Sequence, residues 1–241
     1  MRPTESSSSD REPRAPSSVN IALEGGSATV SGLWLCPPGA YACYVLAHGA
    51  GAGMRHSFME AAAKELATHG VATLRYQFPY MERGSRRPDP PSVCHATVRA
   101  AVAEATRLAP SLPLIAGGRS FGGRMTSQAQ AAVPLDRVLG LAFLGFPLHP
   151  AGRPSIERAE HLAGVQIPVL FLQGTRDELA SLDLLREVVR RLGSRATLKL
   201  FEEADHSFHV PARTGRKDEQ VRQELVASLA GWIRVLIDRG G

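Results

Sequence analysis

A serine lies between two glycines in the segment Gly-Arg-Ser-Phe-Gly at 118–122, which follows an apolar run and precedes an alanine-rich stretch. This pattern between a strand and a helix is typical of a sharp turn that exposes a nucleophilic serine. Only small residues fit two positions before and two after that serine, and Gly118 and Gly122 meet the requirement. A glycine-rich phosphate loop is the competing interpretation, but the segment lacks the lysine of a P-loop and a complete Gly-x-Gly-x-x-Gly. The pattern therefore predicts Ser120 as the nucleophile of an acyl-transfer enzyme.

A serine hydroxyl becomes a good nucleophile only when a base accepts its proton and a carboxylate orients that base. The two partners are expected after the serine, first the acid and then the histidine. Asp177 follows an apolar run at 169–173, and His206 follows a β-rich run at 197–201. Both would lie in loops just beyond strands, so we predict Asp177 as the acid and His206 as the base.

Each partner has a rival nearby. Glu178 and Asp183 could replace Asp177, but a tight turn points Glu178 elsewhere and Asp183 falls within a predicted helix. His209 could replace His206, but three residues further along it is more typical of a side chain at the mouth of a site or in solvent.

Two backbone amides are needed to stabilise the oxyanion of such a reaction. The helix that begins at Phe121 directs its free N–H groups and the positive end of its dipole at the serine, so Phe121 N–H is one predicted donor. The other is expected from the glycine-rich segment 48–53, where we predict Ala50 N–H, with Gly51 as the alternative donor and a substrate contact. His48 closes a buried strand and is expected to bind neighbouring loops.

Arginines near these segments suggest a preference for anionic substrates. Arg83 and Arg86 lie in the proline-rich connection 77–91, and Arg119 adjoins the serine, so together they would favour a carboxylate or phosphate. A solvated basic loop, with Arg119 bound to a structural carboxylate, is the alternative. His149 could line the same pocket, although packing of a proline-flanked loop also explains it.

These residues require a framework of strands and helices, and short β-rich runs do alternate with alanine-rich stretches from residue 19 onward. Strands are predicted at 19–23, 28–36, 41–47, 71–76, 113–117, 138–145, 169–173 and 197–201. Helices are predicted at 57–69, 92–108, 121–132, 182–192 and 219–237. The alternation predicts an α/β fold: a mostly parallel sheet of about eight strands with helices on both faces, opened by an antiparallel hairpin. Ligands bind at the carboxyl ends of such strands, so the three predicted catalytic side chains would meet there.

With 241 residues, of which 44% are hydrophobic, the chain suits one globular domain. Serine, proline and charge dominate 1–18, so we predict a disordered tail there and a single domain over 19–241. That tail has no hydrophobic segment of a signal peptide, and the longest apolar run, at 138–148, is too short to span a membrane. A cytoplasmic protein without membrane association is expected.

Cysteine usage and charge exclude further classes of protein. Cys36, Cys43 and Cys94 are too few and too irregularly spaced for a disulfide framework or a zinc site, so free thiols and no metal are expected. The formal charge of +5 comes mainly from arginines scattered among acidic residues, so no nucleic-acid partner is predicted.

The motifs resemble the α/β-hydrolase superfamily over about 41–237. The resemblance rests on Gly-Arg-Ser-Phe-Gly at 118–122, His-Gly-Ala-Gly at 48–51, Gly-Thr-Arg-Asp at 174–177 and Asp-His-Ser-Phe at 205–208. More narrowly, the segments 78–82, 118–125 and 146–150 are similar to a branch near the dienelactone hydrolases, whose eukaryotic relatives include chromatin-complex subunits and a testis-expressed protein.

The resemblance implies a nucleophile at Ser120, an acid at Asp177, a base at His206 and oxyanion amides at Ala50 and Phe121. Dienelactone hydrolases have a cysteine where this chain has the serine, so their lactone chemistry is not implied. Many members of the superfamily insert a helical cap after the sixth strand, but the corresponding connection here is too short for one.

We therefore predict a cap-poor serine hydrolase that cleaves an ester, thioester or small amide of a small-molecule substrate through an acyl-enzyme on Ser120. No metal, nucleotide or organic cofactor is required for this chemistry. The alternatives are a catalytically idle hydrolase fold that serves as an interaction module, and acyl transfer to an alcohol or peroxide instead of water.

Overall fold

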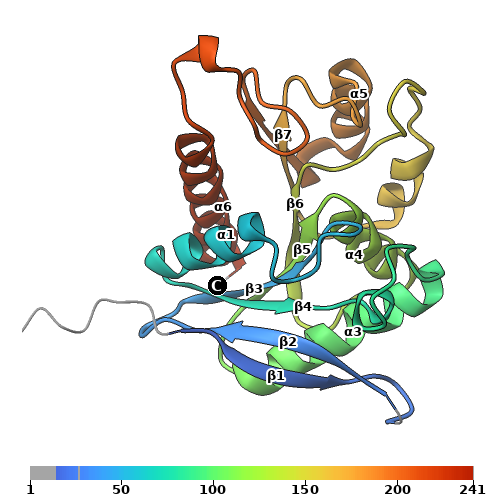
Figure 1. Cartoon of the computed structure of the whole chain (residues 1–241), viewed down its shortest axis with the longest axis vertical. Helices are drawn as coiled ribbons and strands as arrows, with labels where there is room; N and C mark the ends of the chain where they lie inside the picture. Colours follow the sequence, from blue (N-terminus) through green and yellow to red (C-terminus); the bar gives the residue numbers. More distant parts are fainter. Residues whose placement is uncertain (1–14, 27, 241) are drawn as a thin grey trace, which may run out of the picture.

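The computed structural model describes residues 15–26 and 28–240 and contains one eight-stranded sheet with helices on both faces (Figure 1). The strands are β1 (Ser17–Ala22), β2 (Thr29–Leu35), β3 (Ala42–Ala47), β4 (Val71–Tyr76), β5 (Leu114–Arg119), β6 (Val138–Leu144), β7 (Val169–Gly174) and β8 (Ala196–Phe201). The α-helices are α1 (Ser57–Thr68), α2 (Pro79–Glu82), α3 (Pro91–Leu108), α4 (Phe121–Ala132), α5 (Leu182–Leu192) and α6 (Asp218–Gly240). Three short 3-10 helices complete the chain: η1 (Glu157–Gly164), η2 (Gly193–Arg195) and η3 (Ala212–Thr214).

The sheet has the order β1-β2-β4-β3-β5-β6-β7-β8. The pairs β1–β2 and β2–β4 are antiparallel, and every pair from β4 to β8 is parallel. The predicted fold class is therefore confirmed, including the antiparallel strands at the beginning of the chain. The carboxyl ends of β5, β7 and β8 lie at one edge because these three strands run in the same direction.

The start of β1 corrects the predicted boundary of the N-terminal tail. Residues 1–14 of that tail lie outside the described residues, but β1 begins at Ser17, whose Cα pairs with Trp34. Backbone pairing with β2 orders this serine although its own side chain is exposed. Apolar patterning could not reveal such pairing, because the hydrogen bonds of the ladder do not depend on the side chain.

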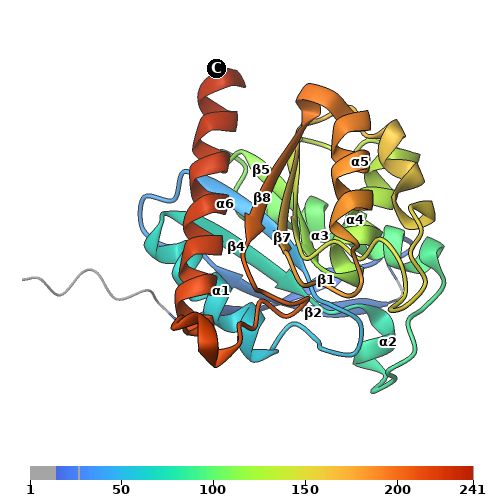
Figure 2. The same cartoon turned by 90° about the horizontal axis from the view of Figure 1, so that it is seen from above.

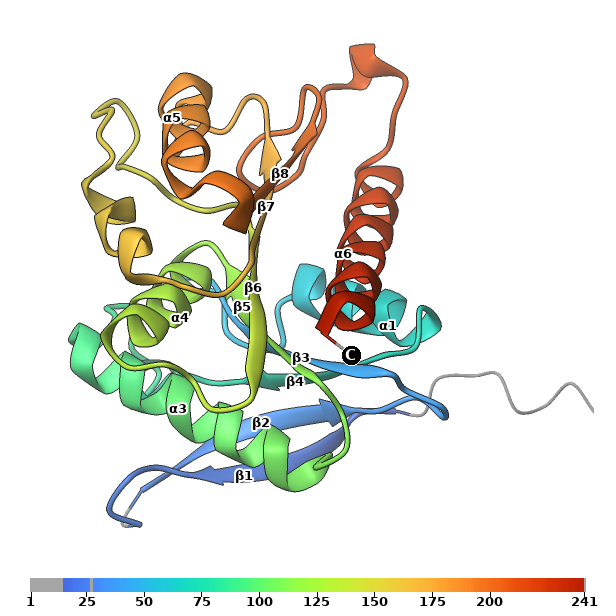
Figure 3. The same cartoon turned by 180° about the vertical axis from the view of Figure 1, so that it is seen from behind.

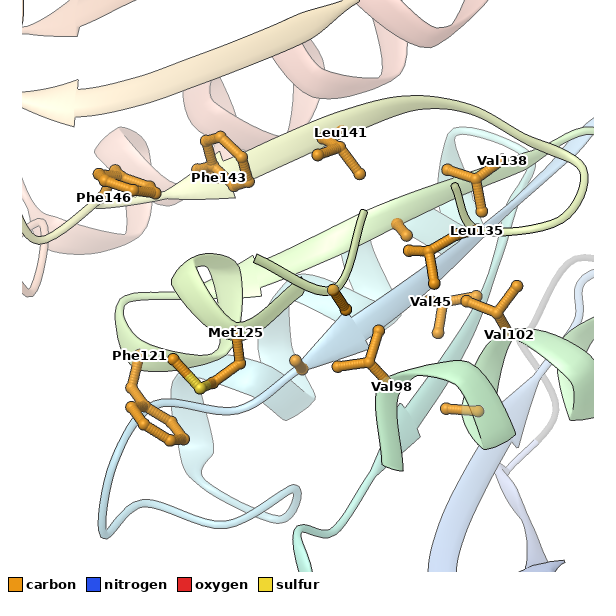
Figure 4. Close-up of a cluster of buried hydrophobic side chains, with 14 of the residues drawn as sticks. Val45, Val98, Val102, Phe121, Met125, Leu135, Val138, Leu141, Phe143 and Phe146 are labelled. Carbon is orange, nitrogen blue, oxygen red and sulfur yellow. The ribbon is translucent and has the colours of Figure 1, made fainter. Parts of the chain in front are cut away.

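Two hydrophobic layers fill the space between the sheet and its helices. Helices α1 and α6 cover one face, and α3, α4 and α5 cover the other (Figure 2). The central parallel strands β3, β4 and β7 are buried along their full length, as expected for strands covered on both faces. Figure 4 shows Val98 and Val102 of α3 and Met125 of α4 packed in the layer that supports the start of α4.

The connections above the sheet are short, and no large cap is present among the described residues, as predicted. The segment between β6 and β7 contains only η1, which lies beside α4 (Figure 3). The connection 77–91 was expected to be a loop, but it contains the single turn α2, because Pro79 has the fixed φ of a first helical residue. None of the helices in the described part of the chain combines the length and apolar character needed to cross a membrane.

Candidate active site

Ser120 lies at the turn between β5 and α4 with a φ of 50° and a ψ of −117°, a conformation that is strained for a residue with a side chain. The chain on either side is too crowded for anything but glycine. A Cβ at Gly118 would lie 2.4 Å from the carbonyl oxygen of Ala47, and one at Gly122 would lie 2.5 Å from that of His48. The two glycines therefore permit the turn that presents the hydroxyl, as the sequence predicted.

The three predicted catalytic side chains lie in one hydrogen-bonded chain. The distance from Ser120 Oγ to His206 Nε2 is 2.8 Å, and His206 Nδ1 lies 2.6 Å from Asp177 Oδ2. A carboxylate can only accept, so Nδ1 carries the proton and Nε2 is free to accept one from the serine. This is the tautomer that a general base requires.

Hydrogen bonds from His206, Gln173 and Leu179 hold the Asp177 carboxylate in place. Its side chain is fully buried, and Leu179 N–H donates to Oδ1 at 2.8 Å. Gln173, at the end of β7, donates its Nε2 to Asp177 Oδ2 and accepts from Phe146 N–H through Oε1 at 2.8 Å. Gln173 was missed in the sequence analysis, although a polar residue at the end of an otherwise apolar strand was a signal for it.

None of the rivals contacts the serine. Glu178 is exposed, and the side chain of Asp183 on α5 is 94% exposed. His209 is exposed as well and pairs with Asp218 at 2.9 Å, which raises the pKa of His209. Asp205 orders the loop that carries His206, because its Oδ1 accepts hydrogen bonds from the backbone N–H groups of residues 207 and 209.

The predicted oxyanion donors lie in two segments next to the serine, since Phe121 follows it directly and Ala50 follows Gly49. Phe121 is the first residue of α4, and Gly49 lies so close that an added Cβ would be 3.8 Å from the Cβ of Ser120. Within residues 15–26 and 28–240, the amides of Ala50 and Phe121 donate to no other group. Both amides are therefore available to a substrate carbonyl oxygen.

The alternative donor, Gly51, is exposed with a φ of +70° and lies near the buried hydroxyl of Tyr80. Burial raises the pKa of Tyr80 to about 12, and the Gly51 backbone opposes that rise. Tyr80 also packs edge-on against Phe121, with ring centroids 6.3 Å apart. The connection 77–91 thus reaches both oxyanion segments, a role for Tyr80 that the sequence did not indicate.

Just after the glycine-rich segment 48–53, Met54 is anchored by a polar side chain of β4 and by another directly after β4. Arg75, only 1% exposed, donates from Nη1 to the Met54 carbonyl at 3.1 Å. Gln77 accepts from Met54 N–H at 2.9 Å. Arg75 stands in a fully buried strand where an aliphatic residue is the rule, and this anomaly could have marked it as a support for the segment.

His48 joins the loops around the nucleophile, as its position predicted. Its Nδ1 donates to the Gly49 carbonyl at 2.8 Å, and its Nε2 accepts from Phe78 N–H at 3.1 Å. A second ring proton would have to bind Nε2, where it would face the Phe78 N–H, which is itself a donor. Burial lowers the pKa of His48 to about 4.

The neutral state of His48 makes the fold sensitive to acid. The unfolded histidine titrates near 6.5 and the folded one near 4, so between these values the unfolded chain binds more protons. Above pH 6.5, His48 makes its full contribution to the free energy of unfolding. As the pH falls toward 4, that free energy decreases by about 3 kcal/mol. Urea unfolding at pH 7.5, 6.5, 5.5 and 4.5 measures this loss. His48→Gln is expected to show a smaller decline over the same range, and equal declines in the two proteins would contradict the assignment.

The predicted substrate arginines have different environments. The Nη2 of Arg119 donates to Ser207 Oγ at 3.0 Å, and its guanidinium lies 4.9 Å from the centre of the Phe58 ring. No carboxylate contacts Arg119 within the described residues, so the expected structural carboxylate is not its partner. Arg83 is exposed and pairs with Asp89 at 2.5 Å.

Two other predictions concerned Arg86 and His149. Arg86 is exposed and has no side-chain partner within residues 15–26 and 28–240. The prediction that His149 lines the substrate pocket is wrong, because the residue is only 3% exposed and both of its ring nitrogens are engaged. Its Nδ1 bonds to the Pro150 carbonyl at 2.9 Å, and its Nε2 accepts from Ser181 N–H at 2.9 Å, so it packs a loop instead of lining a pocket.

A family model for an alpha/beta hydrolase domain matches residues 40–234, so the chain belongs to this family. Among the described residues, no group of three or more His, Cys, Asp or Glu side chains is arranged to hold a metal ion. The fold and the family are those of hydrolases, and the resemblance to the neighbourhood of the dienelactone hydrolases is confirmed.

Solved structures with the same fold cover almost the whole chain. A dienelactone hydrolase from Anabaena variabilis has a TM-score of 0.72 at 19% identity, over 92% of this chain and 98% of that one. A serine hydrolase without a lid from Xanthomonas campestris has a TM-score of 0.69 at 21% identity, over 91% of this chain and 96% of that one. Est1E from Butyrivibrio proteoclasticus with bound ferulic acid has a TM-score of 0.68 at 16% identity, over 88% of this chain and 99% of that one. At these identities the similarity is one of fold.

Proposed function

We propose that this chain is a serine hydrolase that cleaves a carboxylic ester of a small molecule through an acyl-enzyme on Ser120. The observation that carries the proposal is the hydrogen-bonded chain from Ser120 through His206 to the buried Asp177, with distances of 2.8 and 2.6 Å. Such a chain activates a serine for attack on a carbonyl carbon.

In the acylation step, Ser120 Oγ attacks the ester carbonyl carbon while His206 Nε2 accepts the hydroxyl proton. The carbonyl oxygen becomes an oxyanion and accepts hydrogen bonds from the amides of Ala50 and Phe121. Asp177 stabilises the imidazolium that forms. When the tetrahedral intermediate collapses, the bond to the alcohol oxygen breaks, and the proton on Nε2 passes to the departing alcohol.

Deacylation repeats these steps with water. His206 Nε2 accepts a proton from a water molecule, which attacks the acyl carbon and releases the carboxylic acid, and the proton returns to Ser120 Oγ. The same machinery could act on a thioester or a small amide, since only the leaving group differs.

The strained backbone of Ser120 favours catalysis over the alternative of an idle interaction module. A φ of 50° at a non-glycine residue costs about 1–3 kcal/mol and is typical of functional sites. A module that only binds a partner has no use for this strain or for a buried carboxylate oriented at a histidine. Solved relatives described as an esterase and as a serine hydrolase without a lid are in keeping with this proposal.

A panel of 4-nitrophenyl esters from acetate to octanoate tests the proposal. We expect release of 4-nitrophenolate well above the buffer rate for at least one acyl length, and a thioester and an anilide of that length then rank the leaving groups. Release at the buffer rate for every ester would contradict the proposed function.

A further inference from the structure

Among the described residues, the arginines near the nucleophile differ in whether they have a polar partner. Arg119 and Arg83 are engaged by Ser207 and Asp89. Within residues 15–26 and 28–240, the side chain of Arg124 makes no hydrogen bond and contacts no carboxylate, and its Nε is shielded from solvent. A half-buried guanidinium normally binds an anion or several acceptors, so Arg124 is a candidate to bind a ligand.

Arg124 lies close to the reacting centre. Its backbone N–H donates to the Ser120 carbonyl at 3.1 Å, so the two residues are joined across the first turn of α4. The Arg124 guanidinium lies 5.9 Å from the centre of the Phe121 ring. Since the Phe121 amide is a proposed oxyanion donor, Arg124 packs against a residue of the proposed oxyanion site.

The helix η1 brings a second arginine to this place. A contact of 2.7 Å between His161 of η1 and Ser127 of α4 joins the two helices, which lie side by side in Figure 3. Arg158 lies one turn before His161, and within the described residues it also pairs with no carboxylate. Burial and the charge of Arg158 both lower the pKa of Arg124. A bound anion would offset the repulsion between these two like charges.

The contacts of the two arginines suggest which part of the substrate would carry the charge. Arg119 bonds to Ser207, the neighbour of the base His206. Arg124 packs instead against Phe121, a proposed oxyanion donor. Because His206 donates its proton to the departing alcohol, we assign Arg124 to the acyl group of the substrate.

We propose that Arg124 and Arg158 bind a carboxylate on the acyl part of the substrate, so that this hydrolase prefers monoesters of dicarboxylic acids to neutral esters. The inference rests on the function proposed above for Ser120. A guanidinium can bind both oxygens of a carboxylate, which adds geometric selection to the attraction of charge.

The test compares the mono-4-nitrophenyl ester of adipic acid with 4-nitrophenyl hexanoate, which has the same chain length and leaving group. We expect kcat/KM to be about tenfold higher or more for the adipate ester, as for one charge-assisted pair. Arg124→Gln and Arg158→Gln are expected to bring the ratio close to one, and Arg124→Lys to retain part of it. The matched control Arg239→Gln removes the same charge from the last turn of α6 and is expected to keep the ratio.

Salt provides a measurement that needs no variant. At about 1 M NaCl the Debye length falls to about 3 Å, so the preference of the wild-type enzyme for the adipate ester is expected to shrink. Equal kcat/KM for the two esters, or an unchanged ratio in both glutamine variants, would overturn this inference alone. Hydrolysis of neither ester would overturn the proposed function and this inference with it.

Discussion

Replacing Ser120 with alanine is expected to lower kcat for ester hydrolysis by about 10⁴-fold or more. In the proposed mechanism the hydroxyl oxygen forms the acyl-enzyme, and it lies 2.8 Å from His206 Nε2. The fold is expected to survive, because alanine retains the Cβ and removes only an oxygen that points into the site. Initial rates with the best 4-nitrophenyl ester, together with thermal unfolding of both proteins, measure the two effects.

The chain contains a matched control for this experiment. Ser127 also lies on α4 and contacts a histidine, with 2.7 Å between its Oγ and His161 Nε2. Its hydroxyl donates to the Arg124 carbonyl at 2.9 Å, so Ser127 faces His161 as an acceptor and is not activated. Ser127→Ala is expected to retain kcat for neutral esters within about twofold. A similar loss in both alanine variants would show that the effect of Ser120→Ala is structural.

Asp177→Asn is expected to lower kcat by about 10⁴-fold while the protein stays folded. The asparagine side chain has nearly the same shape, but it carries no charge to stabilise the imidazolium. Its NH₂ group would also face the Leu179 N–H donor in the place of Oδ1, or Gln173 Nε2 and His206 Nδ1 in the place of Oδ2, where it would select the wrong tautomer of His206. A pH–rate profile from pH 5 to 10 is the measurement, and the loss is expected at every pH in the plateau.

Asp183→Asn is the control for this substitution, because Asp183 is the exposed rival on α5. It removes the same charge at a side chain in contact only with solvent and Arg186, so kcat is expected to change by less than about twofold. If Asp183→Asn and Asp177→Asn reduced kcat equally, Asp177 would have no special role as the acid.

The residues of the candidate site could be predicted because each is marked by a local pattern. The turn at Ser120 needs glycines two residues away on each side, and this need is visible in the chain itself. Asp177 and His206 were found because parallel strands end at one edge of a sheet, so loops far apart in sequence converge.

The supporting residues could not be predicted in the same way, because their roles depend on contacts between distant segments. Gln173 holds Asp177 only because it also bonds to Phe146 across neighbouring strands. Arg75 and Met54 are brought together by the crossover between β3 and β4, and no pattern in either segment specifies the other. The lack of a polar partner for Arg124 among the described residues likewise depends on how distant segments pack.

Labelling with a fluorophosphonate tests most directly whether His206 activates Ser120. The probe phosphonylates an activated serine, and its leaving group departs, so intact mass reports the stoichiometry and a peptide map locates the adduct. We expect one adduct per chain on Ser120, a much slower reaction in His206→Ala, and none in Ser120→Ala. An unlabelled folded wild-type protein, or an adduct on another serine, would contradict the account.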